Sequence, residues 1–161
     1  MVIGSSATIG TATAFQGNIL AYASITLTSG SNLVGRALAR NAAVTMDNNN
    51  VSLANCSPPA CGLPPLDPPA PSLGSASSFA VLGASTVTCT NASAVTGDVG
   101  VSPGTAITGF NPDCTITGTL HAGDAVAAQA HNDLVTAYNG LEAVACEYNL
   151  TGQDLGGQTL A

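Results

Sequence analysis

One pattern occurs twice in register within the first fifty residues, and it constrains the fold more than any other feature of the chain. Segment 7–21 superimposes on segment 25–39 after a shift of 18 positions, and a third, shorter pass begins at Val44. A fixed period of about 20 residues, made of short β-prone runs and turn residues, is typical of a β-solenoid, because one coil cannot bury its apolar side without a neighbour. We therefore predict stacked coils over residues 5 to about 53.

Apolar and polar residues alternate inside each repeat, as they do in a half-buried strand. In the run Ile25-Thr26-Leu27 the two apolar residues are expected to point inward and the threonine outward. Threonine is also simply a good strand residue, so a structural role alone would explain its frequency. Stacking predicts two outward ladders, one of Thr8, Thr26 and Thr45, and another of Thr11 over Ser29 and Thr13 over Ser31.

The chain carries very little charge. Its 161 residues include two basic side chains, Arg36 and Arg40, and nine carboxylates, for a net charge of −7. We expect neither nucleic acid nor an anionic membrane as a partner, because both are bound through clustered Lys and Arg. No apolar run approaches the roughly 20 residues that span a bilayer. The first residues lack the basic start and long apolar core of a signal peptide, so we expect that segment to be absent from this chain.

The five cysteines indicate the compartment. Their spacings match no zinc pattern, so no metal site is expected. Together with abundant Thr, Ser, Asn and Gly, they predict an oxidising setting, either secreted or at the cell surface. An odd number leaves one cysteine without a partner inside this chain.

The rest of the chain changes character twice. Seven of the nine prolines lie between Pro58 and Pro71, which predicts an extended spacer. After it an apolar-x-Gly signature recurs at 95–97, 107–109 and 116–118, as it does at 15–17 and 33–35. From Gly123 apolar residues fall at helical intervals on one face, which predicts a helix over about 124–146 with Asp124 in its first turn.

Several segments resemble the microbial ice-binding (antifreeze) proteins. Those similar to the N-terminal half of that family are 72–74 with 79–82, 96–104 (TGDVGVSPG), 120–125 (LHAGDA) and 150–157 (LTGQDLGG). Those similar to its C-terminal third are 4–8, 17–21, 24–27, 35–40 and 44–49. The order of the two parts is reversed relative to the family.

The resemblance implies a mostly β fold, a right-handed discontinuous β-solenoid (β-helix) with one long α-helix packed alongside and an incomplete number of coils. Residues 1–56 would be the C-terminal coils of one domain, 57–71 a Pro-rich linker, and 72–161 the N-terminal coils and helix of another. The chain would be a fragment of a tandem array, with neighbouring ice-binding-like domains in a longer chain, or a circular permutant. We expect the coils of 5–53 to stack against 79–120, because about three coils bury too little to stand alone.

The resemblance also implies adsorption to an ice surface and inhibition of ice recrystallisation through a flat solenoid face bearing Thr, Ser and Asn. The ice face of the family carries a short pattern of Thr, Ala or Gly, any residue, and Thr or Asn, which segments 11–14, 29–32 and 91–94 match in part. No cofactor, metal or catalytic residue is expected. The candidate ice-binding residues are Thr11, Thr13, Thr28, Ser29, Ser31, Asn32, Asn48, Asn50 and Ser93.

Two other functions compete with ice binding. An adhesive or spacer module at the cell surface would use the same solenoid without ice activity. A polysaccharide lyase or hydrolase would need clustered carboxylates with a basic residue or metal, whereas the aspartates are far apart in sequence. We therefore expect no enzyme, and we interpret His121, Arg36 and Arg40 as residues that serve the fold.

Disulfide connectivity cannot be deduced from sequence alone. Our preferred pairs are Cys89 with Cys114 and, second, Cys56 with Cys61. Cys146 would then pair with a residue in the part of the family domain that this chain lacks.

Overall fold

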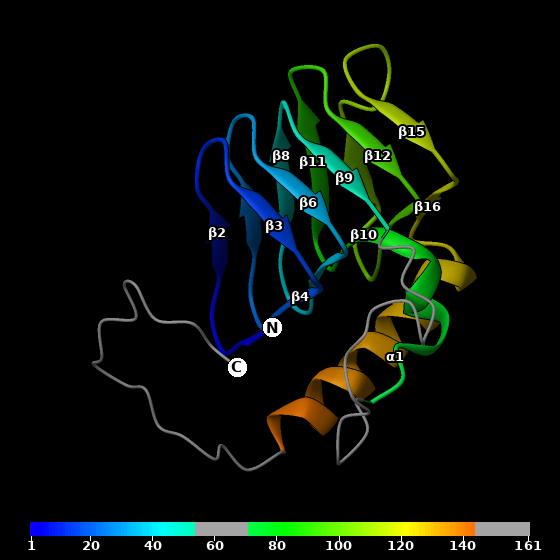
Figure 1. The fold of residues 1–161 in the computed structure, drawn as a ribbon. Coiled ribbons are helices and arrows are strands. Elements are labelled where there is room, and N and C mark those ends of the chain that lie inside the picture. The colour runs from blue at the N-terminus through cyan, green and yellow to red at the C-terminus, as the bar shows by residue number, and fades with distance from the viewer. Residues whose placement is uncertain (54–70, 144–161) are drawn as a thin grey trace, which may run out of the picture.

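The computed structural model describes residues 1–53 and 71–143, which form a parallel β-solenoid of about five turns with one helix alongside (Figure 1). Three sheets make up the walls of the solenoid. We call them the helix-covered sheet, the threonine sheet and the mixed sheet. The predicted fold class is confirmed.

Each turn contributes one strand to each sheet. The threonine sheet contains β2 (Ala7–Ile9), β5 (Ile25–Leu27), β8 (Val44–Asp47), β11 (Thr86–Thr90) and β14 (Ala106–Thr108). The mixed sheet contains β3 (Ala14–Gln16), β6 (Asn32–Val34), β9 (Asn50–Ser52), β12 (Ala94–Thr96) and β15 (Thr115–Thr117). The helix-covered sheet contains β1 (Val2–Ile3), β4 (Ile19–Ala21), β7 (Ala37–Ala39), β10 (Phe79–Gly83), β13 (Asp98–Val101) and β16 (Leu120–Ala122).

The register of the first coils is the one that the repeat predicts. Thr8 pairs with Thr26 and Thr26 with Thr45, while Phe15 pairs with Leu33 and Leu33 with Val51. Ile25 and Leu27 are buried on either side of a partly exposed Thr26, as alternation requires. The interior is therefore a stack of apolar rungs, with small alanines along the helix-covered wall at positions 21, 37 and 39.

The two halves of the sequence form one stack, which confirms that they meet. The strands on either side of residues 54–70 pair in all three sheets: β7 with β10, β8 with β11, and β9 with β12. Strand order along each sheet follows the chain, so the solenoid continues across the interruption (Figure 1). The assignment of the halves to two successive domains stays a prediction.

The helix α1 (Ala125–Glu142) lies along the helix-covered sheet, from the β16 end to the β1 end (Figure 1). Its buried face carries Ala130, Leu134 and Tyr138, which pack on a ladder of leucines, Leu20, Leu38 and Leu82. The predicted helix is confirmed over these residues, and the part of the prediction from 144 to 146 lies outside the described residues. Asp124 is the N-cap instead of a residue of the first turn, because its backbone is extended and its carboxylate accepts from the Ala127 N–H.

A short 3₁₀ helix, η1 (Gly74–Ser78), joins the helix to the solenoid. The Arg36 guanidinium donates to the Ser77 carbonyl through Nε and Nη2 and to Asn18 Oδ1 through Nη1. On the other side, the Asp133 carboxylate accepts from the Ser75 N–H. Arg36 therefore serves the fold, as predicted.

The disulfide between Cys89 and Cys114 is present, as predicted, with the two Cα atoms 6.3 Å apart. It joins β11 of the threonine sheet to the turn that precedes β15. The predicted Cys56–Cys61 pair and Cys146 lie outside the described residues.

Candidate functional site

An unbroken column of five threonines runs along the outer surface of the threonine sheet. Thr8 pairs with Thr26, Thr26 with Thr45, Thr45 with Thr88, and Thr88 with Thr108. The two end members are exposed and the three inner ones are partly exposed. We call this set the central threonine column. Three of its members come from the first half of the sequence and two from the second.

The hydroxyls of this column remain available to solvent. Within the described residues, the only hydrogen bond recorded among them joins Thr108 Oγ1 to Thr88 Oγ1, at 3.4 Å. In four of the five strands the threonine lies between two buried apolar residues, such as Val44 and Met46, whereas Thr108 lies between the half-buried Ile107 and Gly109. Because the branched side chain of threonine is stiff, the column presents a repeated hydroxyl and methyl pattern with little conformational freedom.

A second outward column lies two residues after the central column in the three middle coils. It contains Thr28, Asp47 and Thr90, and we call it the flanking column. The Thr28 hydroxyl donates to the Ile9 carbonyl at 2.7 Å, and the Thr90 hydroxyl to the Met46 carbonyl at 3.0 Å. These bonds hold the two threonine hydroxyls against the preceding coil.

The nine residues predicted from sequence do not lie on one surface. Thr28 lies directly after β5 of the threonine sheet, whereas Asn32 and Asn50 are exposed on the mixed sheet, where they pair with each other. Exposed residues on the corners between these two sheets are Thr11, Thr13, Ser29 and Asn48. The sequence predicted the first three members of the central threonine column, Thr8, Thr26 and Thr45, as an outward ladder, but this ladder was not chosen as the site.

The prediction that Ser31 and Ser93 face outward is wrong, since each is 1% exposed. Asn49, which sequence reasoning missed, lies between them and is 3% exposed. Its amide Nδ2 donates to the Ser31 carbonyl and to Ser31 Oγ, each at 3.0 Å, and its backbone N–H donates to Ser93 Oγ at 2.9 Å. At the corner between the threonine sheet and the mixed sheet, the side chains of Ser31, Asn49 and Ser93 therefore point into the coil, where they form a hydrogen-bonded polar ladder.

The mixed sheet presents a less regular surface than the threonine sheet. One outward column reads Ala14, Asn32, Asn50, Ala94 and Thr115, and the next reads Gln16, Val34, Ser52, Thr96 and Thr117. These columns mix side chains of different length and polarity. They offer no repeated group over five rungs.

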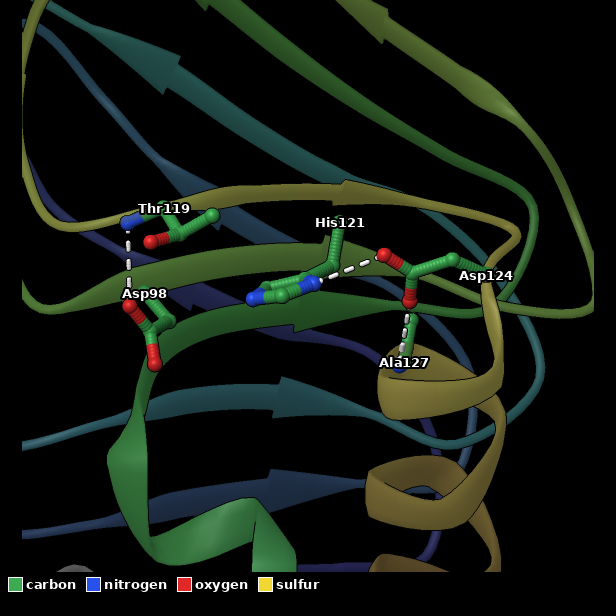
Figure 2. A network of polar contacts seen from close by, with 5 residues as sticks. All are labelled: Asp98, Thr119, His121, Asp124 and Ala127. Carbon is green, nitrogen blue, oxygen red and sulfur yellow. Dashed lines mark hydrogen bonds and ion pairs between the residues drawn. The ribbon is translucent and has the colours of Figure 1, made fainter.

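A polar network lies where α1 begins, at the far edge of the helix-covered sheet (Figure 2). His121 Nδ1 is 2.7 Å from Asp124 Oδ2, and Asp124 Oδ1 accepts from the Ala127 N–H at 2.8 Å. The Ala127 N–H, and next the His121 side chain, hold the pKa of Asp124 below its usual value. Asp98 Oδ1 accepts from the Thr119 N–H at 2.9 Å. The network caps the helix, and His121 is a structural hydrogen bonder, as predicted.

The second arginine also has a structural role. Arg40 Cζ lies 5.4 Å from the Tyr22 ring centroid and 5.1 Å from that of Tyr138, so the guanidinium packs against both rings. The Tyr138 hydroxyl donates to the Ile3 carbonyl at 3.1 Å. These contacts fasten the C-terminal part of α1 to the first coils.

Residues 1–53 and 71–143 contain no cluster of three or more His, Cys, Asp or Glu side chains that could hold a metal ion. The helix in this part of the chain is not apolar enough to cross a bilayer.

Comparisons with known proteins indicate the family of this chain. A family model described as "Ice-binding-like" matches residues 1–52 and 81–161. A protein of Nostoc sp. (strain HG1), named "Ice-binding protein", is 52% identical over 88 residues, which cover 55% of this chain. The match spans 32% of that relative, about a third of its length. No solved structure matches the chain.

Proposed function

The chain belongs to the ice-binding-like family, and from this premise we propose that it adsorbs to ice through the outer surface of the threonine sheet. The central threonine column is the observation that carries the proposal. In it one small, stiff, uncharged side chain repeats over five successive rungs. The Nostoc relative's name supports ice as the partner.

The spacing of the sheet explains how such a column acts on water. Successive rungs lie about 4.7–4.9 Å apart, and outward residues along one strand lie about 6.6–6.8 Å apart. The surface is therefore a two-dimensional grid of hydroxyl and methyl groups that orders water into a lattice-like layer. Each position contributes little, and affinity comes from many weak contacts made together.

The residues predicted from sequence form a competing contact surface on the neighbouring corner and the mixed sheet. Thr11, Ser29 and Asn48 are exposed there, and Thr11 Oγ1 lies 3.4 Å from Thr28 Oγ1 of the flanking column. The corner therefore borders the proposed ice face. Ser31 and Ser93 are excluded from direct contact with ice by their burial.

The test replaces Thr45, the middle rung of the column, with tyrosine. Thr45→Tyr is expected to abolish thermal hysteresis and recrystallisation inhibition, because a bulky ring at the centre holds the surface away from the lattice. The matched control is Asn50→Tyr, which places the same ring on the mixed sheet. Both sites are on the solenoid surface, so each variant should stay within about 0.5 kcal/mol of the wild-type stability.

Other results of these substitutions would favour a different ice face or a function other than ice binding. Activity that survives Thr45→Tyr and is lost in Asn50→Tyr or Ser29→Tyr would move the ice face to the mixed sheet or the corner. A folded wild-type chain with no effect on ice growth or recrystallisation would contradict the proposal and favour the adhesive or spacer module.

We also propose that the protein works outside the cytoplasm, secreted or at the cell surface, next to further ice-binding-like domains. The buried Cys89–Cys114 disulfide supports an oxidising compartment. The short coverage of the Nostoc relative is compatible with additional domains. Fractionation of the native host with an antibody to this chain would test the location.

A further inference from the structure

One charged side chain interrupts the proposed ice face. Among the described residues, Asp47 is the only Asp, Glu, Lys or Arg on the outer surface of the threonine sheet. It pairs with Thr90 on one side, and the corresponding residue of the preceding coil is Thr28. If position 47 were a threonine, the flanking column would be three consecutive threonines beside the central one.

The contacts of Asp47 explain why a carboxylate occupies this place. Its Oδ1 accepts from Asn91 Nδ2 at 2.7 Å, and Thr90 Oγ1, which donates to the Met46 carbonyl, lies 3.5 Å from the same oxygen. Asn91 and Ala92 have φ values of 51° and 56°, a left-handed conformation that costs free energy in residues other than glycine. The bond from Asn91 to Asp47 braces this turn across the junction between the two halves of the sequence.

The same carboxylate is unfavourable for a surface that binds ice. Ice offers no counter-charge, and removing water from an ionised carboxylate without a compensating partner is costly. Within the described residues no protein donor is recorded for Asp47 Oδ2, so this oxygen depends on water. The carboxylate therefore places a strongly oriented hydration shell in the flanking column, two residues along the strand from Thr45.

We propose that Asp47 determines the strength of ice binding, by confining the effective contact surface to the central threonine column. The inference rests on the proposed function of the threonine sheet. The carboxylate stabilises the turn at Asn91 and limits the width of the ice face. Removing its charge while keeping an acceptor for Asn91 separates these two effects.

The experiment uses the full chain and the variant Asp47→Asn, whose amide oxygen still accepts from Asn91 Nδ2. We expect the concentration required for a given recrystallisation inhibition to fall about fivefold, the factor that corresponds to the lower limit of the penalty for an unpaired buried polar group. The melting temperature should stay that of the wild type. A second variant, Asp47→Thr, makes the flanking column three consecutive threonines and should also increase activity. Its melting temperature should be lower than that of the wild type, because the hydrogen bond from Asn91 to Asp47 is lost.

The controls distinguish this inference from the proposed function. Glu142→Gln removes one negative charge from the exposed end of α1 and should leave activity unchanged. If Thr45→Tyr abolishes activity but neither Asp47 variant increases it, the inference is overturned and the ice face stands. If Thr45→Tyr has no effect, the ice face itself is overturned. An equal gain in Glu142→Gln would show that net charge matters and would overturn the role of Asp47.

Discussion

At the scale of single residues, the position in the coil decides what a polar side chain does. Thr26 and Thr45 lie within strands, where alternation directs them outward, and within the described residues their side chains form no recorded hydrogen bond. Ser31 lies at a corner, where alternation ends, and it is buried. The same residue class therefore supplies the proposed ice surface in one place and an internal polar ladder in another.

The polar ladder leads to a prediction about stability. Asn49→Ala removes the amide that donates to Ser31 and to the Thr28 carbonyl, and the acceptors left behind are partly or fully buried. We expect a loss of about 1–3 kcal/mol in the free energy of unfolding, the cost of leaving buried polar groups unpaired. Urea denaturation measures it. The control Asn32→Ala, on the exposed face of the mixed sheet, should change stability by less than about 0.5 kcal/mol.

A result in which the two variants lose equal stability would mean that the hydrogen bonds of Asn49 contribute no more to stability than a surface contact does.

The buried position of Ser31 also changes an expectation drawn from sequence. Ser31→Tyr should unfold the corner, so it is unsuitable as a test of the ice face.

At the scale of elements, the strands and the helix follow local sequence patterns. One of these patterns, the apolar-x-Gly signature, occurs at the ends of strands in two different sheets. The apolar-x-Gly signature at Phe15, Leu33, Val95 and Ile116 ends strands of the mixed sheet, whereas at Ile107 it ends β14 of the threonine sheet. At Gly35, φ is 150° and an added Cβ would lie 2.0 Å from the Gly17 carbonyl oxygen, so glycine is required there. The signature predicts a turn, but it does not specify the corner.

The start of α1 gives a prediction about pH. Because hydrogen bonds from Ala127 and His121 lower the pKa of Asp124 in the folded state, its contribution to stability is fully present above the unfolded pKa, near pH 4. It is lost as the pH falls toward the lower, folded value. The melting temperature of Asp124→Ala should therefore be below that of the wild type at pH 7, and the difference should shrink below about pH 4. Thermal unfolding followed by circular dichroism over this range measures it.

Asp113→Ala is the control, because it removes an exposed carboxylate from the turn between β14 and β15. It should not reproduce the pH-dependent difference. A melting-temperature difference for Asp124→Ala that stays constant from pH 7 down to pH 2 would contradict the role of the ionised cap.

At the scale of the whole molecule, the junction between the two halves of the sequence crosses the proposed ice face. Thr45 and Thr88 are neighbours there, although 43 positions separate them in the chain. The central threonine column depends on this junction, and so does the bond from Asn91 to Asp47. Any change that opens the junction should weaken ice binding, even where no surface threonine is altered.

The disulfide allows the outer end of the stack to be tested. Cys89 and Cys114 are separated by 25 positions, and both are buried beside the last coils. Replacing both with alanine should lower the free energy of unfolding by roughly 3–4 kcal/mol, the value expected from loop entropy for a closed loop of this length. Urea denaturation of the double variant provides the measurement. An unchanged midpoint would mean that stacking alone holds β14 and β15 in place.

The sequence by itself determined the coil period, the inward and outward alternation within strands and the helix, and several of its segments resembled the ice-binding family. These features could be predicted because they are set by neighbours a few residues apart or by one repeat on the next. The 18-residue shift was enough to align Thr8, Thr26 and Thr45, but it stops before residues 54–70. The sequence therefore indicated three rungs of the column and could not join them to Thr88 and Thr108.

The tertiary structure decided that junction, because pairing of β8 with β11 depends on packing between coils from distant parts of the chain. It also decided that Ser31 and Ser93 point inward, since the direction of a corner side chain depends on left-handed residues such as Asn91 and Ala92 that no periodicity reveals. For the same reason Asn49 was missed and Asp47 was not recognised as a brace. The candidate surface is thus a product of register between distant coils, and its individual strands are a product of local sequence.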